Sequence, residues 1–399
     1  MRLPRLSQLP DVRGKTVLLR LDLNVPQSAS GVVGHEDDWK IQKSLPTIEH
    51  ILSRGASIII LTHWGRPKGK AVPEYAVEPI ARFVGRLIKK NISVLPLAIL
   101  KNRTAPRMQA GQVAMLENVR FHAGEDKNDA RFARALAALG SVYVNDAFAV
   151  CHRAAASVVG ITKYLPSFAG DQLYLEVSVL EQVRERPRQP FEVIMGGLKF
   201  ETKIPVIRRL LSRARHIMLG GGLSSTILAS LGYGVGSSEI DHAYFKQARA
   251  LMKDKKIMLP VDVIIGHKHN RGDYHHVRIP IAPATLCSSA YAIYDIGPET
   301  VRRYSQLIKK AETIVWNGPL GLFEDRPYDQ GTLAIARVVA ARSKGHSFGV
   351  VGGGETVVAL KRTQTLHWVD HVSTGGGAML EYLGGAEMPG ISALEQKRV

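Results

Sequence analysis

Short apolar runs that end in glycine recur through the second half of this chain and constrain its fold most. These are His216–Leu219 before Gly220–Gly222, Phe348–Val351 before Gly352–Gly354, and Val193–Met195 before Gly196–Gly197. Such a run is typical of a buried strand followed by a tight turn. Glycine lets the backbone approach a ligand closely, so that N–H groups can hold a phosphate. With a further triplet at Gly375–Gly377, the pattern predicts several strand ends that converge on one phosphorylated ligand.

In the first half, strand-like runs end in charged or polar side chains instead of glycine. The runs are Thr16–Leu21, Ser57–Thr62, Val113–Leu116 and Val142–Val144, and Asp22, Asn24, His63, Arg66 and Arg120 are among the side chains that follow them. Ligands of open parallel α/β sheets bind outside the carboxyl ends of the strands. Each of these residues taken singly would be a surface charge or a helix cap. Together they predict an anionic small molecule on the first half and a nucleotide on the second.

The apolar runs alternate with amphipathic segments such as Val77–Lys90 and Asp129–Leu139, which predicts βαβ units and parallel sheets. A chain of 399 residues is long for one core, so two domains are expected. Asp171–Arg186 contains no glycine or proline and predicts a helix between the halves, with its ends as candidate hinges. The predicted class is α/β, with two Rossmann-like domains whose parallel sheets face a central cleft. We expect the domains at 1–168 and 187–384, with the hinge helix at 169–186.

Composition narrows the possible partners. The net charge is +18, and residues 1–168 carry 24 basic and 13 acidic side chains, which suits an acidic substrate. Aromatic residues make up only 7%, and no nucleic-acid-binding motif occurs, so a nucleic-acid function is disfavoured. No signal-peptide core or membrane-length apolar run is found, and Cys151 and Cys287 are far apart. These observations favour a cytoplasmic protein without a membrane partner.

The chain contains no Walker loop, zinc-protease motif or nucleophile elbow, and no convincing pairing of a nucleophile with a base. Phosphoryl transfer between two anionic oxygens needs mainly positioning and charge neutralisation. The absence of these motifs is therefore compatible with a phosphotransferase.

Motifs in matching order along essentially the whole chain resemble the phosphoglycerate kinase family. They are Arg20–Pro26, His63–Gly69, Leu116–His122, Val144–Phe148 with His152-Arg153, Gly196–Lys199 with Lys203, Trp316–Glu324 and Ser373–Ala378. The resemblance implies a phosphotransferase with a carboxyl group as acceptor. Its reaction would be reversible transfer between 1,3-bisphosphoglycerate with MgADP and 3-phosphoglycerate with MgATP. It also implies Mg²⁺ as cofactor, a monomer, and a C-terminal tail, about 385–399, that returns to the N-terminal domain.

The resemblance also implies roles for individual residues. Phosphoglycerate would be bound by Asp22, Asn24, His63, Arg66, Arg120 and Arg153. The nucleotide would be bound by Gly197, Leu198, Lys199, Lys203, Gly221, Asn317, Pro319, Gly321, Leu322, Glu324, Gly353, Gly354, Glu355 and Thr356. Catalysis would rest on Lys40, Lys199, Gly375 and Gly376, with Glu355 also holding the metal.

Two positions depart from the family pattern. Lys40 stands where the family has an arginine that stabilises the phosphoryl group in transfer, and a lysine keeps the charge but loses the planar fork. Glu355 stands where the family has an aspartate that holds magnesium, and its side chain is one methylene longer. An alternative interpretation follows, in which the chain is a ligand-binding paralogue with lost or reduced catalysis and a regulatory role.

A cluster of histidines lies outside these motifs. His267, His269, His275 and His276 invite a metal interpretation, but basic residues interleave with them. We therefore expect a solvated loop rather than a metal site.

Overall fold

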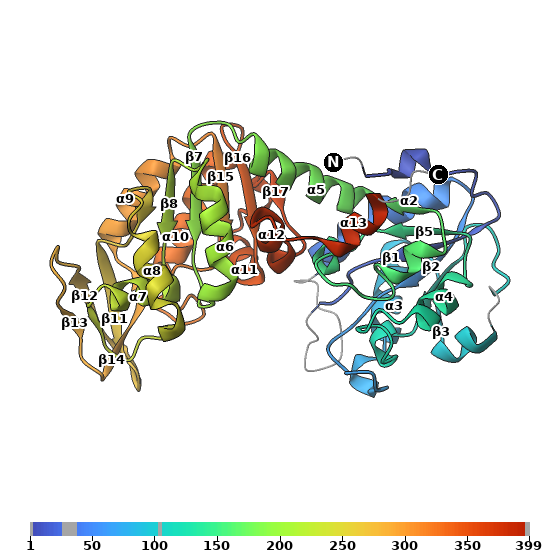
Figure 1. The fold of residues 1–399 in the computed structure, drawn as a ribbon, viewed down its shortest axis with the longest axis horizontal. Helices are drawn as coiled ribbons and strands as arrows, with labels where there is room; N and C mark the ends of the chain where they lie inside the picture. The colour runs from blue at the N-terminus through green and yellow to red at the C-terminus, as the bar shows by residue number, and fades with distance from the viewer. Residues whose placement is uncertain (1–2, 26–37, 103–105, 396–399) are drawn as a thin grey trace. The chain divides into compact units, whose positions relative to one another are not determined.

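The computed structural model describes residues 3–25, 38–102 and 106–395. The chain divides into two compact units, of which unit 1 comprises Met1–Ser178 with Glu387–Val399 and unit 2 comprises Val179–Ala386 (Figure 1). The boundary between the two units lies within helix α5 (Asp171–Glu185), the helix predicted between the halves. Its hinge role and a cleft between the sheets stay predictions. None of the helices in the described ranges has the length and apolar character needed to span a membrane.

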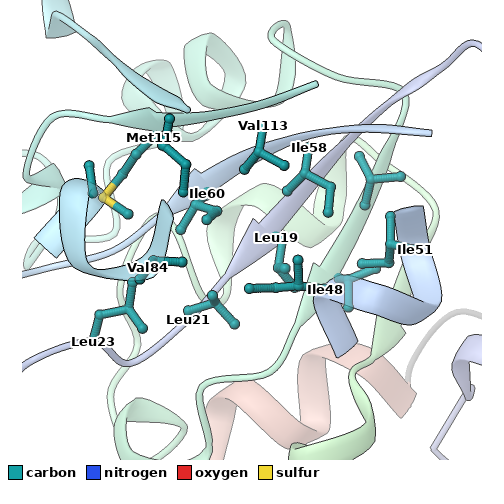
Figure 2. Packing of buried hydrophobic residues seen from close by; sticks show 14 of the residues in the cluster. Leu19, Leu21, Leu23, Ile48, Ile51, Ile58, Ile60, Val84, Val113 and Met115 are labelled. Atoms are coloured by element: carbon teal, nitrogen blue, oxygen red, sulfur yellow. The ribbon is translucent and has the colours of Figure 1, made fainter. Parts of the chain in front are cut away.

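Unit 1 is built on a six-stranded parallel sheet. Its order is β3 (Ile92–Leu95), β4 (Val113–Leu116), β2 (Ser57–Leu61), β1 (Thr16–Arg20), β5 (Val142–Asn145) and β6 (Ser167–Ala169). The central strands are rich in isoleucine, leucine and valine and are buried on both faces, as expected for a parallel sheet between helices. Figure 2 shows Leu19 and Ile58 of these strands near Ile48 and Ile51, and Ile60 near Met115.

The helices of unit 1 are short and amphipathic. They are α1 (Asp38–Gln42), α2 (Leu45–Ser53), α3 (Glu78–Leu87), α4 (Ala130–Ala137) and α13 (Pro389–Glu395), with 3₁₀ turns at Leu6–Gln8, Pro73–Tyr75, Leu97–Asn102, Val119–Phe121, Phe148–Val150 and Gly160–Lys163. Helix α4 begins after Asp129, whose side chain accepts a hydrogen bond from the N–H of Phe132. Helix α13 is part of unit 1, where the N–H of Gly390 donates to the carbonyl of Cys151 at 2.9 Å.

Unit 2 contains a second six-stranded parallel sheet. Its order is β10 (Ile257–Met258), β8 (His216–Leu219), β7 (Phe191–Met195), β15 (Thr313–Asn317), β16 (Phe348–Gly352) and β17 (His371–Val372). The strand order reverses between β7 and β15, which makes that point the expected ligand site of a doubly wound sheet. The predicted α/β class with two parallel sheets is confirmed.

The helices of unit 2 pack in two groups. One group is α6 (Phe200–Leu211), α7 (Gly221–Ser230), α8 (Phe245–Leu251) and α12 (Gly376–Leu383), and the other is α9 (Pro298–Ile308), α10 (Gln330–Ser343) and α11 (Gly354–Arg362), with 3₁₀ turns at His242–Tyr244 and Leu366–Trp368. Because connections between parallel strands are right-handed as a rule, we expect the two groups on opposite faces of the sheet. Helices α7, α11 and α12 begin at or beside the three glycine triplets, so each triplet forms a strand-to-helix turn.

The histidine-rich segment is a β-hairpin, so the prediction of a loop was wrong, whereas the predicted exposure is confirmed for His269, His275 and His276. Strand β11 (Asp262–His267) pairs antiparallel with β12 (Asn270–Arg278) and with β14 (Tyr291–Ile296), while β13 (Thr285–Cys287) pairs with β9 (Gly234–Val235). His276 contacts Asp262 at 2.7 Å and His275 contacts Asp273 at 3.0 Å. Across the described ranges, no cluster of histidine, cysteine and acidic side chains has the arrangement that would hold a metal ion.

A buried carboxyl group that contacts the first turn of α5 is expected to make the stability of the protein depend on pH. Asp146, directly after β5, accepts a hydrogen bond from the N–H of Leu173 at 2.9 Å. Burial raises the pKa of Asp146 to about 7, although hydrogen bonds from Thr47 and Leu173 oppose the shift. An unfolded aspartate titrates near pH ~4. The unfolded chain therefore loses this proton at lower pH than the folded protein, so this group's contribution to stability falls as pH rises from about 4 to about 7.

The amide in Asp146→Asn cannot ionise. We therefore expect the free energy of unfolding of this variant to fall by a few kcal/mol less than that of the native protein between about pH 4 and about pH 7. The measurement is the free energy of unfolding in urea at several pH values between about 4 and 8. Asp11→Asn, at an exposed position of the same unit, is the control. The same pH slope in Asp146→Asn as in the native protein would contradict the expectation.

Candidate active site

Loops at the carboxyl edge of the unit 1 sheet enclose a cavity of about 240 Å³. They follow β1, β2, β4 and β5, which are parallel and in register, so their carboxyl ends meet at one edge. The cavity is lined by Asp22, Asn24, His63, Gly65, Arg66, Arg120, Ala149, Val150, His152 and Arg153. The structure thus brings together all six residues that the sequence predicts to bind phosphoglycerate.

Asp22 is held as a carboxylate at the base of this cavity. Burial alone would raise the pKa of Asp22, but the charges of Lys40 and Arg20 contribute to lowering it to about 2. Its carboxylate forms an ion pair with Lys40 of α1, which is not itself among the described residues that line the cavity. At neutral pH Asp22 can therefore only accept hydrogen bonds, as orientation of a substrate hydroxyl requires. Beside it, the side-chain oxygen of Asn24 accepts from the N–H of Gly65 at 3.0 Å.

His63 is fixed as a neutral hydrogen-bond donor. Burial and the charge of Arg20 hold the pKa of His63 well below its ordinary value. The Nη2 atom of Arg20 lies 3.0 Å from Nδ1 of His63. Because a guanidinium can only donate, Nδ1 accepts and the proton of the neutral ring is on Nε2. That atom lies 4.0 Å from the carboxylate of Asp22, on the side of the cavity.

A chain of buried polar side chains leads from His63 to Arg20, Ser157 and Glu125, and the sequence interpretation assigned no role to it. Nε of Arg20 donates to the hydroxyl of Ser157 at 2.9 Å, and that hydroxyl donates to Glu125 at 2.5 Å. Burial raises the pKa of Glu125, while the charge of Arg20 opposes the shift. The only sequence signal was an arginine inside the otherwise apolar run Thr16–Leu21.

The arginines give the cavity its positive charge. Nη1 of Arg120 donates to the carbonyl of Gly65 at 2.8 Å, which fixes the guanidinium. Burial lowers the pKa of Arg120, and the nearby charge of Arg153 acts in the same direction. Two guanidinium groups close enough to repel each other favour an anion between them, and each can bind a phosphate through two parallel hydrogen bonds.

In unit 2, a cavity of about 350 Å³ lies at the point where the strand order reverses. The predicted nucleotide-binding residues that line it are Gly197, Leu198, Lys199, Lys203, Gly221, Pro319, Gly321, Leu322, Glu324 and Glu355. The sequence interpretation missed Thr202, Gly222, Ser225, Glu239, Ile293 and Tyr294, which also line it. Ile293 and Tyr294 belong to the antiparallel sheet, which was not predicted.

The cavity contains partly buried positive and negative side chains that suit a nucleotide phosphate and a cation. Burial lowers the pKa of Lys203, with Glu355 opposing the shift. Burial raises the pKa of Glu355, and the charge of Glu324 raises it further. A phosphate would compensate Lys203, and a divalent cation would compensate Glu355. Magnesium in nucleotide sites commonly takes one or two carboxylates and substrate phosphates as ligands, so this donor fits it.

The four other predicted nucleotide residues are not among the described residues that line the cavity, but they tie its elements together. The side chain of Asn317 donates to the carbonyl of Gly352 at 2.9 Å, and the hydroxyl of Thr356 accepts from the N–H of Gly318 at 2.8 Å. Gly353, with φ of +101°, lies between Asn317 and Thr356, and Gly354 opens α11. These contacts join the end of β15 to the start of α11.

The predicted catalytic glycines lie where α12 begins. Gly375 precedes the helix, and its N–H donates to the hydroxyl of Ser373 at 3.3 Å. Gly376 lies so close to Gly353 that an added Cβ atom would be 2.6 Å from its backbone. Only glycine fits there, and the amino ends of α11 and α12 are thereby held side by side.

Comparison with known proteins supports the sequence interpretation over the full length. The family model described as phosphoglycerate kinase matches residues 6–386. A phosphoglycerate kinase of Desulfosudis oleivorans is 42% identical and that of Pelotomaculum thermopropionicum is 39% identical, each match covering 97% of this chain and 98% of the relative. The structure of phosphoglycerate kinase from Coxiella burnetii matches with a TM-score of 0.85 at 35% identity and 99% coverage of both chains.

The two-unit α/β fold and its two cavities therefore place the chain among the phosphotransferases that share this fold. The chain belongs to the phosphoglycerate kinase family, and the family predicted from its motifs is confirmed.

Proposed function

We propose that this chain is an active phosphoglycerate kinase. It moves a phosphoryl group reversibly between 1,3-bisphosphoglycerate and a magnesium-bound nucleoside diphosphate, for which the family resemblance gives ADP. The observation that carries the proposal is that one cavity of unit 1 gathers all the predicted phosphoglycerate-binding residues and one cavity of unit 2 gathers most of the predicted nucleotide-binding residues. A cytoplasmic monomer remains our expectation.

The unit 1 cavity binds the phosphoglycerate. Arg66, Arg120 and Arg153 hold its phosphate, because guanidinium groups match a phosphate in charge and geometry. Asp22 accepts a hydrogen bond from the substrate hydroxyl, and Nε2 of His63 donates one. Since both side chains are buried and fixed by neighbours, the substrate meets a preorganised site.

The unit 2 cavity binds the nucleotide. Lys199 and Lys203 neutralise phosphate charge, and Glu324 accepts hydrogen bonds from the ribose. Glu355 would hold Mg²⁺, which would supply neutralisation of the phosphate charge. The amino ends of α11 and α12, joined at Gly353 and Gly376, direct N–H groups toward the transferred phosphoryl group.

Lys40 supplies the positive charge that the family draws from an arginine. In unit 1 its ammonium group forms an ion pair with Asp22, which positions it beside the substrate cavity. A lysine satisfies the charge requirement without the bidentate fork, so we expect measurable but reduced turnover.

A turnover assay combined with calorimetry tests this function against the ligand-binding alternative. We expect the purified protein to form ATP from 1,3-bisphosphoglycerate and MgADP, and to bind 3-phosphoglycerate. Arg66→Ala should weaken 3-phosphoglycerate binding by about 1.5–3 kcal/mol, the range for a lost hydrogen bond to a charged group. Binding of both substrates without turnover would favour the regulatory paralogue. Unchanged affinity in Arg66→Ala would contradict the assignment of the phosphate site.

A further inference from the structure

The nucleotide cavity of unit 2 contains one acidic side chain that the proposed phosphate, ribose and metal contacts leave unused. Glu239 lines the cavity together with Ile293 and Tyr294. It is exposed, and among the residues that the structure describes its carboxylate has no ion pair or hydrogen bond. A carboxylate can only accept hydrogen bonds, so Glu239 offers a ligand two acceptor oxygens.

The backbone on both sides of Glu239 is fixed. The hydroxyl of Ser238 accepts from the N–H of Ile293 in β14 at 2.8 Å. The N–H of Asp241 donates to the hydroxyl of Thr226 in α7 at 3.1 Å. Glu239 therefore lies between α7 and β14 on a segment that is anchored at either end, as a residue that determines specificity requires.

Glu239 is separate from the charges at the phosphate end. The charged groups that act on Lys203 are Glu355 and Lys199, and those that act on Glu355 are Glu324 and Lys203. Within the described part of the chain, Glu239 contributes to neither shift. Lys203 lies near the amino end of α6 and Glu355 near that of α11. Glu239 instead lies between α7 and β14 and lines the cavity beside Ile293 and Tyr294. With the phosphates placed at the amino ends of the helices, the base of the nucleotide is the part left for Glu239.

The walls beside Glu239 suit a flat aromatic ring. Ile293 and Leu322 are apolar lining residues, and the N–H of Leu322 donates to the carbonyl of Tyr294 at 2.6 Å, which joins the two sides. The ring of Tyr294 is held between the guanidinium of Arg271, 4.2 Å from its centroid, and the ring of Tyr328 at 5.0 Å. Apolar walls with one polar group are the usual composition of a site that orients a ligand.

We propose that Glu239 recognises the nucleobase and that this cavity prefers guanine to adenine nucleotides. The proposal rests on the nucleotide-binding function of the cavity proposed above. Guanine presents two adjacent donors, N1–H and the N2 amine, which a carboxylate can accept together. Adenine presents its N6 amine beside N1, an acceptor that repels a carboxylate oxygen. A polar group matched to one base discriminates strongly, because the other base leaves it unpaired.

Calorimetry on the full chain with MgGDP, MgADP and MgIDP tests the proposal. We expect GDP to bind about ten- to a hundred-fold more tightly than ADP, the range for a charge-assisted hydrogen-bond pair at an exposed position. IDP keeps N1–H but lacks the N2 amine, so its affinity should lie between the two. Equal affinities for GDP and ADP, or tighter binding of ADP, would overturn the proposal.

Variants of Glu239 test whether this residue causes the preference for GDP over ADP. Glu239→Leu should remove the preference by weakening GDP binding while ADP binding stays the same or improves, and Glu239→Gln should reduce it. The matched control is Glu312→Gln, which removes the same charge at the amino end of β15, where Glu312 pairs with Arg342 at 3.4 Å. A GDP preference that persists in Glu239→Leu would refute the role of Glu239. Failure of the native protein to bind any of these nucleotides would instead contradict the proposed nucleotide site itself.

Discussion

Replacing Lys40 by alanine is expected to lower turnover by about a hundred- to a thousand-fold, the loss seen when one preorganised charge that stabilises a transferring group is removed. The affinity for 3-phosphoglycerate should change little, because Lys40 pairs with Asp22 but is not among the described residues that line the cavity. Steady-state kinetics would therefore show the loss in kcat rather than in KM. Lys40→Arg should raise turnover above that of the native protein, because the planar fork is restored.

The matched control for Lys40 is Lys43→Ala, which removes an exposed positive charge three residues further along the chain. It should leave kcat unchanged, so that a general effect of net charge can be separated from the effect of position. Native turnover in Lys40→Ala would show that the residue is not catalytic.

Replacing Arg20 by methionine is expected to cost about 3–5 kcal/mol of folding free energy, the scale for removing one partner from a buried charged network. Arg20 is only 2% exposed, and Glu125 is equally buried at 2%. Without the guanidinium, Glu125 would keep its hydrogen bonds from Ser157 but lose the nearby positive charge. Denaturation in urea measures the loss, and weaker binding of 3-phosphoglycerate should accompany it because His63 loses the donor that fixes its ring.

A double-mutant cycle separates the charge from the packing. Glu125→Gln removes the carboxylate, so Arg20→Met combined with Glu125→Gln should be more stable than the sum of the single losses predicts. Strict additivity would mean that the two groups do not interact. A midpoint of Arg20→Met equal to that of the native protein would contradict a structural role for the buried arginine.

Much of the fold and of both cavities follows from local sequence. The runs Thr16–Leu21 and Ser57–Thr62 are short, apolar and rich in β-branched or leucine side chains, and each ends in the polar residues that line the first cavity. In a parallel sheet the carboxyl ends share one edge, so the order of residues along each strand is enough to gather them. The strand-to-helix turns are predicted in a similar way, from the glycine residues that directly follow an apolar run.

The features that the sequence did not predict depend on contacts between distant segments. Strand β12 alternates exposed and half-buried positions without an apolar face, so its pairing with β11 and β14 could not be inferred from periodicity. Arg20 meets Ser157 across 137 residues of sequence, and nothing near either residue indicates the partner. The same holds for Glu239, whose place in the nucleotide cavity depends on hydrogen bonds from β14 and to α7.

Because α13 is part of unit 1, the first 178 residues are not a self-contained piece of the protein. Gly390 lies so close to Cys151 that an added Cβ atom would be 3.1 Å from its sulfur, and the thiol is fully buried. Burial also raises the pKa of Cys151 to about 12, which keeps the thiol unreactive while the helix covers it. A fragment that stops within α5 would uncover this thiol to oxidation, together with the apolar surface beneath Ile391 and Leu394. A short C-terminal truncation would therefore disturb unit 1, although the chain from Val179 to Ala386 belongs to unit 2.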